Sequence, residues 1–132
     1  MRTRIRLWNV KGVPLRCLIV DDNSLFLQGA VDLLTREGLD VVGVATDSAE
    51  AIRLVTELEP EVMLVDIDLG DDDGFQLTQR LHAVSGDLKV ILVSTHAEDD
   101  LAHLIERSSA IGFIAKACLS ADAIRDTLER AA

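Results

Sequence analysis

The sequence predicts an α/β protein with a doubly wound, five-stranded parallel sheet and five helices. Five short apolar runs alternate with segments whose apolar residues recur at helical spacing. The runs are almost continuously apolar, which indicates strands that are buried on both faces of a parallel sheet. The 132 residues suit one domain, and a hydrophobic content of 48% supports a core. Because aromatic residues make up only 3%, we expect that core to be aliphatic.

The first two strand–helix units occupy residues 15–59, with strands expected at 15–20 and 41–45. The first helix has its apolar positions at Phe26, Ala30, Leu33 and Leu34. Gly38 follows this helix as a typical C-terminal cap. Ser48 is a candidate N-terminal cap for the second helix, and Pro60 ends it. The apolar positions of the second helix are Ala51, Val55 and Leu58.

The remaining strands are expected at residues 62–65, 88–93 and 112–115. Gly74 opens the third helix and Ser120 caps the fifth. The inward positions are Leu77, Leu81 and Val84 in the third helix. They are Leu101, Leu104, Ile105 and Ser108 in the fourth helix, and Ile124, Leu128 and Ala131 in the fifth. Right-handed crossovers between such units give a flavodoxin-like sheet with strand order 2-1-3-4-5.

Residues 1–13 are expected to be an appendage to a domain that covers residues 14–132. A disordered tail or a misassigned start codon is the simpler interpretation, and an edge strand formed by Arg4–Leu7 is the alternative. Residues 12–132 carry 9 basic and 23 acidic residues, a formal charge of −14 that repels nucleic-acid phosphates. We therefore expect no direct nucleic-acid binding by the domain.

The composition also bears on the compartment. No apolar stretch approaches the ~20 residues that span a bilayer, and no apolar segment of a signal peptide follows the basic N-terminus. We therefore expect no membrane association and a cytoplasmic location. Cys17 and Cys118 suit a reducing compartment, and we interpret both as small packing residues.

Polar residues stand at the end of four of the five apolar runs. Asp21 and Asp22 follow the first run, Asp66 follows the third, Ser94 the fourth and Lys116 the fifth. In open α/β sheets, ligands bind at the carboxyl edge, where the ends of parallel strands meet. Three carboxylates, a hydroxyl and an ammonium at that edge predict a site for a divalent cation and a phosphoryl group.

The chain resembles the receiver domains of response regulators in two-component signalling. The matching segments are Leu18–Asp22, Val65–Asp66 with Gly74 eight residues on, Val93–Ser94 and Phe113–Lys116. They occur in the family's order and spacing, and the resemblance covers about residues 15–131. It implies that Asp66 accepts a phosphoryl group from a histidine kinase or a histidine phosphotransfer protein. The chain would then be a phosphoacceptor signalling protein, not an enzyme, with self-catalysed phosphotransfer and autodephosphorylation only.

The resemblance further implies a Mg²⁺ site. Asp22 and Asp66 would be direct ligands, Asp21 would act through water, and the backbone carbonyl of Asp68 would fill another position. A hard cation offsets the repulsion between a carboxylate nucleophile and an anionic phosphoryl group.

The remaining roles that the resemblance assigns concern the phosphoryl group. Lys116 would place its charge at one phosphoryl oxygen, and the Ser94 hydroxyl would donate a hydrogen bond to another. Ser94 and Phe113 would form the switch, with Phe113 rotating into space that Ser94 vacates; a plain core position is the alternative for Phe113. Asp68 and His96 occupy the positions that tune phosphoryl lifetime in the family, and a solvated loop histidine is the alternative for His96.

Three positions depart from the family pattern. Ala117 stands where a proline with a cis bond usually follows the lysine, so this bond should be trans. Gly70 replaces a common proline, and the β-branched Thr95 replaces a very small residue, which would narrow access to Asp66. The acidic run 71–73 is interpreted as a solvated loop beside the cation site.

Two other functions fit parts of the pattern. One is a receiver-like interaction module without phosphorylation, although such a module usually lacks one of the acidic or lysine positions. The other is a haloacid-dehalogenase-like phosphatase, because Asp66–Asp68 matches an Asp-x-Asp pattern. In those enzymes, however, the pattern follows the first strand, and no cap domain fits this length.

The sequence also bears on how a phosphorylated receiver of this kind would act on its downstream target, which is its output. Leu119–Asp122 resembles receivers that precede a DNA-binding domain, but no such domain is present in these 132 residues. We therefore expect a stand-alone receiver that contacts an unknown downstream protein through the fourth helix, fifth strand and fifth helix. A phosphorylation-dependent homodimer is another form that this output would take.

Overall fold

The computed structural model describes residues 13–96 and 98–131. The appendage predicted for residues 1–13 therefore lies outside the described residues, apart from Val13. The edge strand considered for Arg4–Leu7 lies outside them as well.

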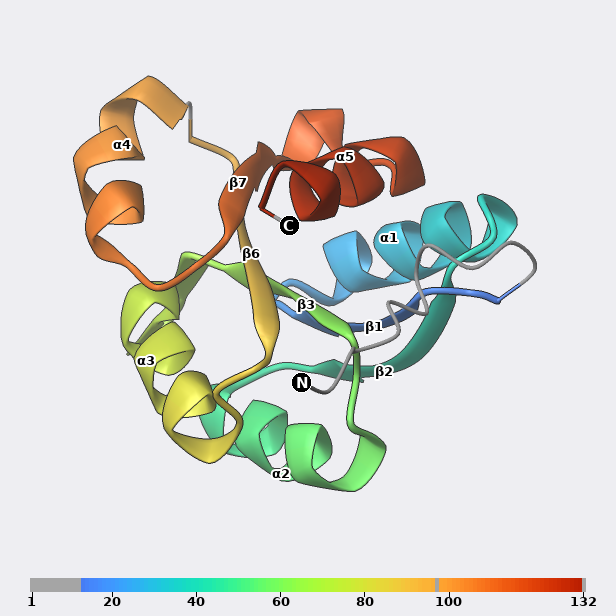
Figure 1. Cartoon of the computed structure of the whole chain (residues 1–132), viewed down its shortest axis with the longest axis horizontal. Coiled ribbons are helices and arrows are strands. Elements are labelled where there is room, and N and C mark those ends of the chain that lie inside the picture. The colour runs from blue at the N-terminus through green and yellow to red at the C-terminus, as the bar shows by residue number, and fades with distance from the viewer. Residues whose placement is uncertain (1–12, 97, 132) are drawn as a thin grey trace, which may run out of the picture.

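Five parallel strands form the central sheet, in the order β2-β1-β3-β6-β7 (Figure 1). They are β1 (Arg16–Val20), β2 (Asp40–Ala45), β3 (Val62–Asp66), β6 (Lys89–Ser94) and β7 (Gly112–Ala115). Counted along the chain within this sheet, the order is 2-1-3-4-5, so the predicted topology is confirmed. Two further strands, β4 (Asp68–Leu69) and β5 (Asp72–Asp73), form a short antiparallel hairpin where the sequence predicts a solvated loop.

Helices cover both faces of the sheet (Figure 1). They are α1 (Ser24–Arg36), α2 (Ser48–Leu58), α3 (Gly74–Val84), α4 (Glu98–Arg107) and α5 (Ala121–Ala131). α1 and α5 cover one face, and α2 and α3 cover the other, while α4 packs against the edge strand β7. None of the helices in the described part of the chain has the length and apolar character needed to cross a membrane.

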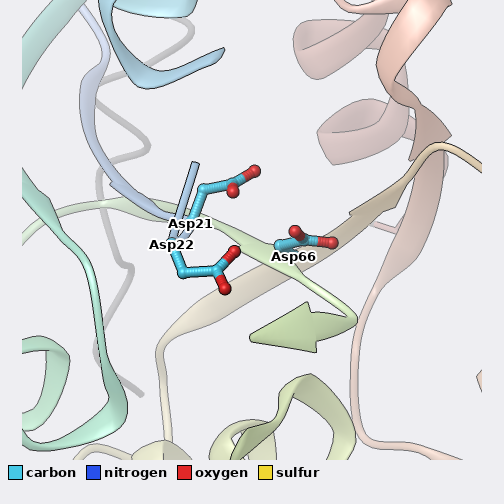
Figure 2. A group of neighbouring side chains, drawn as sticks. All are labelled: Asp21, Asp22 and Asp66. Atoms are coloured by element: carbon cyan, nitrogen blue, oxygen red, sulfur yellow. The ribbon is translucent and has the colours of Figure 1, made fainter. Parts of the chain in front are cut away.

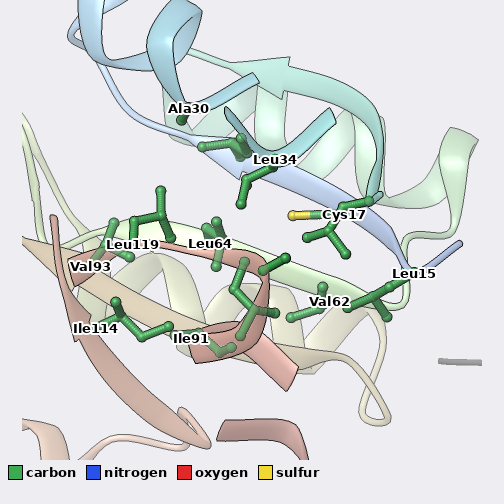
Figure 3. Close-up of a cluster of buried hydrophobic side chains, with 14 of the residues drawn as sticks. Leu15, Cys17, Ala30, Leu34, Val62, Leu64, Ile91, Val93, Ile114 and Leu119 are labelled. Atoms are coloured by element: carbon green, nitrogen blue, oxygen red, sulfur yellow. The ribbon is translucent and has the colours of Figure 1, made fainter. Parts of the chain in front are cut away.

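Aliphatic side chains form one core on each face of the sheet. Within β1, Cys17 and Ile19 join the core under α1 and α5. Figure 3 shows this core. Leu18 and Val20 join the core under α2 and α3. All four side chains are fully buried. A strand that is buried on both faces has no reason to alternate polar and apolar residues, which accounts for its continuous apolar run.

Most predicted helix ends are confirmed, with one correction. Gly38 follows α1 with a φ of 95°, and Ser120 Oγ accepts a hydrogen bond from the backbone of α5. The cap of α2 is Asp47, whose side chain accepts from Glu50 N at 2.8 Å, and not Ser48. Asp47 has the extended backbone that a cap requires, whereas Ser48 is already helical and buried.

Four inward or packing positions are wrong. Val84 is 50% exposed at the last residue of α3, and Ala131 is exposed at the last residue of α5. Cys118 is exposed in the short 3-10 turn Lys116–Cys118, whereas Cys17 is buried as expected. Leu104 is 47% exposed within α4, which packs against the edge strand β7. At Val84 and Ala131 the helical pattern of the sequence continues to the end of the helix, beyond the point where the helix still faces the sheet.

Gly74 brings the start of α3 into direct contact with the end of β3. A Cβ atom at this position would overlap the Asp66 carbonyl oxygen and lie 2.7 Å from Ile67 Cα, and backbone atoms do not yield as a flexible side chain does. Gly74→Ala should therefore lower the free energy of unfolding by about 2–3 kcal/mol. Urea unfolding measures this effect.

Gly29→Ala is the matched control for that variant. Gly29 lies inside α1, and a Cβ atom there would have nothing within 4 Å. We expect this change to raise stability by about 0.5–1 kcal/mol, because alanine is the better helix former. A Gly74→Ala protein as stable as Gly29→Ala would contradict the close approach of α3 to β3.

Candidate functional site

The sheet brings the predicted site residues to one edge. Asp66 is the last residue of β3 and Ser94 is the last residue of β6. Asp21 follows β1 directly, and Lys116 follows β7 directly. Because all these strands are parallel neighbours in the sheet, the four residues emerge together at its carboxyl edge.

Three carboxylates lie together at this edge. Asp21 and Asp22 come from the end of β1 and Asp66 from the end of β3 (Figure 2). One oxygen atom from each lies within 4.8 Å of the others. Asp21 and Asp66 are buried, whereas Asp22 is exposed, so the cluster opens to solvent on one side.

Backbone N–H groups fix the orientation of two of these carboxylates. Asp21 Oδ1 accepts a hydrogen bond from Asn23 N at 2.8 Å, and Asp66 Oδ1 accepts one from Asp68 N at 3.1 Å. Gly70, in the turn of the β4–β5 hairpin, has a φ of 73°, and a Cβ atom there would lie 3.1 Å from an Asp22 oxygen. The hairpin therefore approaches the cluster closely, and its Asp68 is exposed beside it.

The Lys116 ammonium balances the buried charge. Its Nζ lies 2.6 Å from Asp21 Oδ2 and donates a hydrogen bond to Asp66 Oδ2 at 3.2 Å. It also lies 4.3 Å from the centre of the Phe26 ring. Only 13% of the Lys116 side chain is exposed, so these interactions are partly shielded from water.

The carboxylate set suits a hard divalent cation. Mg²⁺ prefers carboxylate and water oxygens and needs few protein ligands. Asp21 Oδ2 is buried and, within the described part of the chain, accepts no hydrogen bond of good geometry despite the nearby ammonium. The three carboxylates offer oxygen atoms within 4.8 Å of one another, which is the donor chemistry that Mg²⁺ takes, so the residues fit this ion.

Burial and neighbouring charges shift the pKa values of Asp66 and Lys116. The pKa of Asp66 is raised from 3.8 to about 6: burial is the largest cause and the charge of Asp21 adds to it, while the hydrogen bond from Asp68 N and the Lys116 ammonium oppose the rise. Burial also disfavours the charged form of Lys116, but pairing with Asp21 and Asp66 outweighs it and raises the pKa of the ammonium. A proton and a metal ion therefore compete for Asp66.

The raised pKa of Asp66 predicts a pH-dependent effect on stability. The folded protein holds the Asp66 proton more tightly than the unfolded chain does, so this contribution is complete below about pH 4 and is lost as pH rises through about 6. Without metal, Asp66→Asn should therefore be more stable than the wild type at pH 7.5, by about 1–2 kcal/mol.

Urea unfolding in EDTA between pH 4 and 8 measures this difference. Mg²⁺ should stabilise the wild type and leave the stability of Asp66→Asn nearly unchanged, so the difference in stability between the two proteins should become smaller. Equal stability of the two proteins across the whole range without metal would contradict the raised pKa.

The other predicted site residues lie on or beside β6 and β7. Ser94 is buried, and its Oγ accepts a hydrogen bond from His96 N at 3.0 Å, while His96 itself is exposed. Phe113 is half-buried against the core under α2 and α3. It also lines an open pocket of about 590 Å³ between β7 and α5, together with Thr127 and Arg130. The Lys116–Ala117 bond is trans, as expected.

Three residues make contacts that the sequence did not predict, two of them at this edge of the sheet and the third, His82, at the opposite edge. Asn23 caps α1 and bonds to Asp21, and an Asn between a strand and a helix is a recognisable cap signal. Phe26 was identified only as an apolar helix position. His82 Nδ1 lies 2.6 Å from Ser109 Oγ, and His82 Nε2 lies 2.8 Å from the Leu88 carbonyl oxygen.

Comparison with known families decides what this arrangement is. The response regulator receiver domain model matches residues 17–129. The chain belongs to the response regulator receiver family. The receiver domain is thus a signalling module of two-component systems, and the predicted resemblance is confirmed.

Individual relatives agree with this assignment. The receiver domain is 31% identical over 115 residues to the transcriptional regulatory protein LiaR of Bacillus subtilis, covering 84% of this chain and 54% of LiaR. It is 32% identical over 103 residues to the response regulator GacA of Pseudomonas aeruginosa, covering 77% and 48%. The chain thus spans about half the length of the curated relatives it matches.

Solved structures show the same fold. The receiver domain of NarL from Mycobacterium tuberculosis superposes with a TM-score of 0.76 at 28% identity, covering 89% of this chain and 96% of that one. The receiver domain of a modulated diguanylate cyclase from Desulfovibrio desulfuricans G20 gives a TM-score of 0.72 at 32% identity, covering 88% and 91%.

Proposed function

We propose that this receiver domain accepts a phosphoryl group on Asp66 from a histidine kinase or a histidine phosphotransfer protein. The observation that carries the proposal is the buried acceptor itself. Asp66 lies within 4.8 Å of two further carboxylates and 3.2 Å from the Lys116 ammonium. Asp66 thus lies between carboxylates that attract a cation and an ammonium that attracts a phosphoryl group.

Each site residue has a separate role in this phosphoryl transfer. Asp66 forms a P–O bond while the P–N bond of the phosphohistidine breaks and the imidazole leaves with the electron pair. Asp22 and Asp66 would hold Mg²⁺ directly, Asp21 through water, and the Asp68 carbonyl would complete the set. The bound ion supplies charge neutralisation between nucleophile and phosphoryl oxygens. Lys116 would place its positive charge at one phosphoryl oxygen. The Ser94 hydroxyl would donate a hydrogen bond to another.

A small phosphodonor with a P–N bond tests the proposal without the cognate kinase. We expect incubation with phosphoramidate and Mg²⁺ to add one phosphoryl group, seen by intact-protein mass spectrometry. EDTA should prevent the addition, and borohydride reduction of the acyl phosphate should place it at Asp66. No adduct with Mg²⁺ present, or an adduct that EDTA does not affect, would contradict the proposal.

The output is proposed to be a change in protein contacts. The new charge draws Ser94 toward the phosphoryl group, and Phe113 rotates within β7. α4, β7 and α5 border that ring and would contact a downstream protein or a second phosphorylated copy. The presence of all the acidic and lysine positions argues against a module that is never phosphorylated.

Asp68 and His96 are proposed to tune the phosphoryl lifetime. Both are exposed, and their backbone N–H groups bond to Asp66 and Ser94 respectively, which places them at the rim of the site. Hydrolysis needs a water molecule in line with the Asp66 oxygen, and rim side chains orient or exclude that water. We expect Asp68→Ala and His96→Ala each to change the dephosphorylation rate several-fold.

Loss of phosphate after removal of the donor measures this rate by mass spectrometry. Asp71→Ala and His103→Ala are matched controls, because both residues are exposed. They should lose phosphate at the wild-type rate. The hypothesis fails if Asp68→Ala and His96→Ala behave like these controls.

A further inference from the structure

We propose that Phe26 is a positioning residue that holds the Lys116 ammonium at the phosphoryl site through a cation–π contact. Lys116 Nζ lies 4.3 Å from the centre of the ring, well within the ~6 Å range of such contacts. The inference deepens the proposed function, because it concerns the group that would meet the phosphoryl oxygens.

The position of the ring is set by the same elements that hold the carboxylates. Asn23 N donates to Asp21 Oδ1 at 2.8 Å, and the Asn23 side chain in turn accepts from Phe26 N at 3.1 Å. Phe26 therefore lies in the first turn of α1, held by Asn23 at a fixed position relative to Asp21. Its ring packs half-buried against the core under α1 and α5. The ring is thus placed relative to the charged cluster and not merely within the core.

Lys116 needs a partner other than the carboxylates. Its present ion-pair partners are Asp21 Oδ2 and Asp66 Oδ2, and these carboxylates belong to the set that would serve the cation. Once Asp21 and Asp66 serve a divalent ion, they hold the ammonium less tightly, and the ion itself repels it. Among the described contacts of Lys116 Nζ, the ring of Phe26 is the one that metal binding leaves in place.

The surroundings make this contact stronger than one at an open surface. Only 13% of the Lys116 side chain is exposed, and cation–π attraction increases as water is removed. The ring attracts the ammonium without neutralising it, so the full positive charge stays available to a phosphoryl oxygen. A carboxylate in the same place would hold Lys116 but cancel that charge.

Nuclear magnetic resonance tests the contact in the metal-free protein, independently of phosphorylation. The chain has three lysines, Lys11, Lys89 and Lys116, so their ε-methylene signals are few, and Lys116→Met identifies the relevant one. We expect the Lys116 ε-protons to be shifted by the ring current of Phe26. Phe26→Leu should remove this shift, and Phe26→Trp should restore it. An ordinary shift in the wild type would overturn the contact.

Labelling kinetics test the consequence. With phosphoramidate and Mg²⁺, Phe26→Leu should label Asp66 about three- to tenfold more slowly than the wild type. Phe26→Trp should recover the rate, because it restores a π face. Val31→Ala, which removes apolar volume from α1 without touching Lys116, is the matched control and should label at the wild-type rate.

If Phe26→Trp does not fold, fluorinated phenylalanine at position 26 tests whether the negative face of the ring sets the labelling rate. Fluorine weakens the negative face of the ring while keeping its shape, so the rate should fall stepwise from phenylalanine to the trifluoro analogue. Equal rates across this series, or a Phe26→Leu protein as fast as the wild type, would overturn the proposal. Absence of any label on the wild type would instead overturn the proposed function, while the metal-free resonance shift still reports on the ring.

Discussion

Asp66→Asn is expected to reduce phosphoryl incorporation to background while leaving the fold intact. The amide has almost the size of the carboxylate but no nucleophilic oxygen anion, so the P–O bond cannot form. Asp66 is the last residue of β3 and only 5% exposed, and the change removes a buried charge instead of creating one. The stability of this variant should therefore equal or exceed that of the wild type, which separates lost chemistry from lost structure.

Mass spectrometry after incubation with phosphoramidate and Mg²⁺ gives the result directly. Asp32→Asn is the matched control, because Asp32 is an exposed carboxylate on α1, outside the cluster. It should be labelled like the wild type. Label on Asp66→Asn at the wild-type level would show that another side chain is the acceptor, and peptide mapping would then identify it.

The main features of the fold and of the site follow from the sequence because both depend on the same property of the strands. A run such as 62–65 is apolar throughout only when the strand is buried on both faces, and β3 is buried along its whole length. The first polar residue after such a run has to lie at the sheet edge. Asp66 and Lys116 could therefore be placed near each other without knowledge of any contact.

What the sequence could not predict depends on short-range competition or on packing between distant elements. Asp47 and Ser48 are both good caps, and only the backbone conformation decides between them. The β4–β5 hairpin has no apolar alternation, so its acidic residues gave no strand signal. The contact of Phe26 with Lys116 joins α1 to the end of β7, and helical spacing predicts only that Phe26 faces inward.

Lys116→Ala is expected to separate phosphorylation from the response to it. Lys116 approaches Asp66 at 3.2 Å but is not the nucleophile, so labelling should continue, about 10- to 100-fold more slowly because one source of positive charge is lost. The variant also loses the competitor that now occupies the Asp21 and Asp66 oxygens. Its affinity for Mg²⁺, measured by calorimetry, should therefore be at least that of the wild type.

The response should be lost because Lys116 is the first residue after β7 and the Asp66 charge reaches that strand through its side chain. Amide resonances report this: in the wild type, phosphorylation should shift signals of β7 and of Phe113, whereas in labelled Lys116→Ala these signals should stay near their unphosphorylated positions. Lys89→Ala, which removes an exposed ammonium at the start of β6, should label and respond normally. If labelled Lys116→Ala shows the full wild-type shifts, the charge reaches β7 by another route, and Ser94 at the end of the neighbouring strand β6 becomes the residue to test.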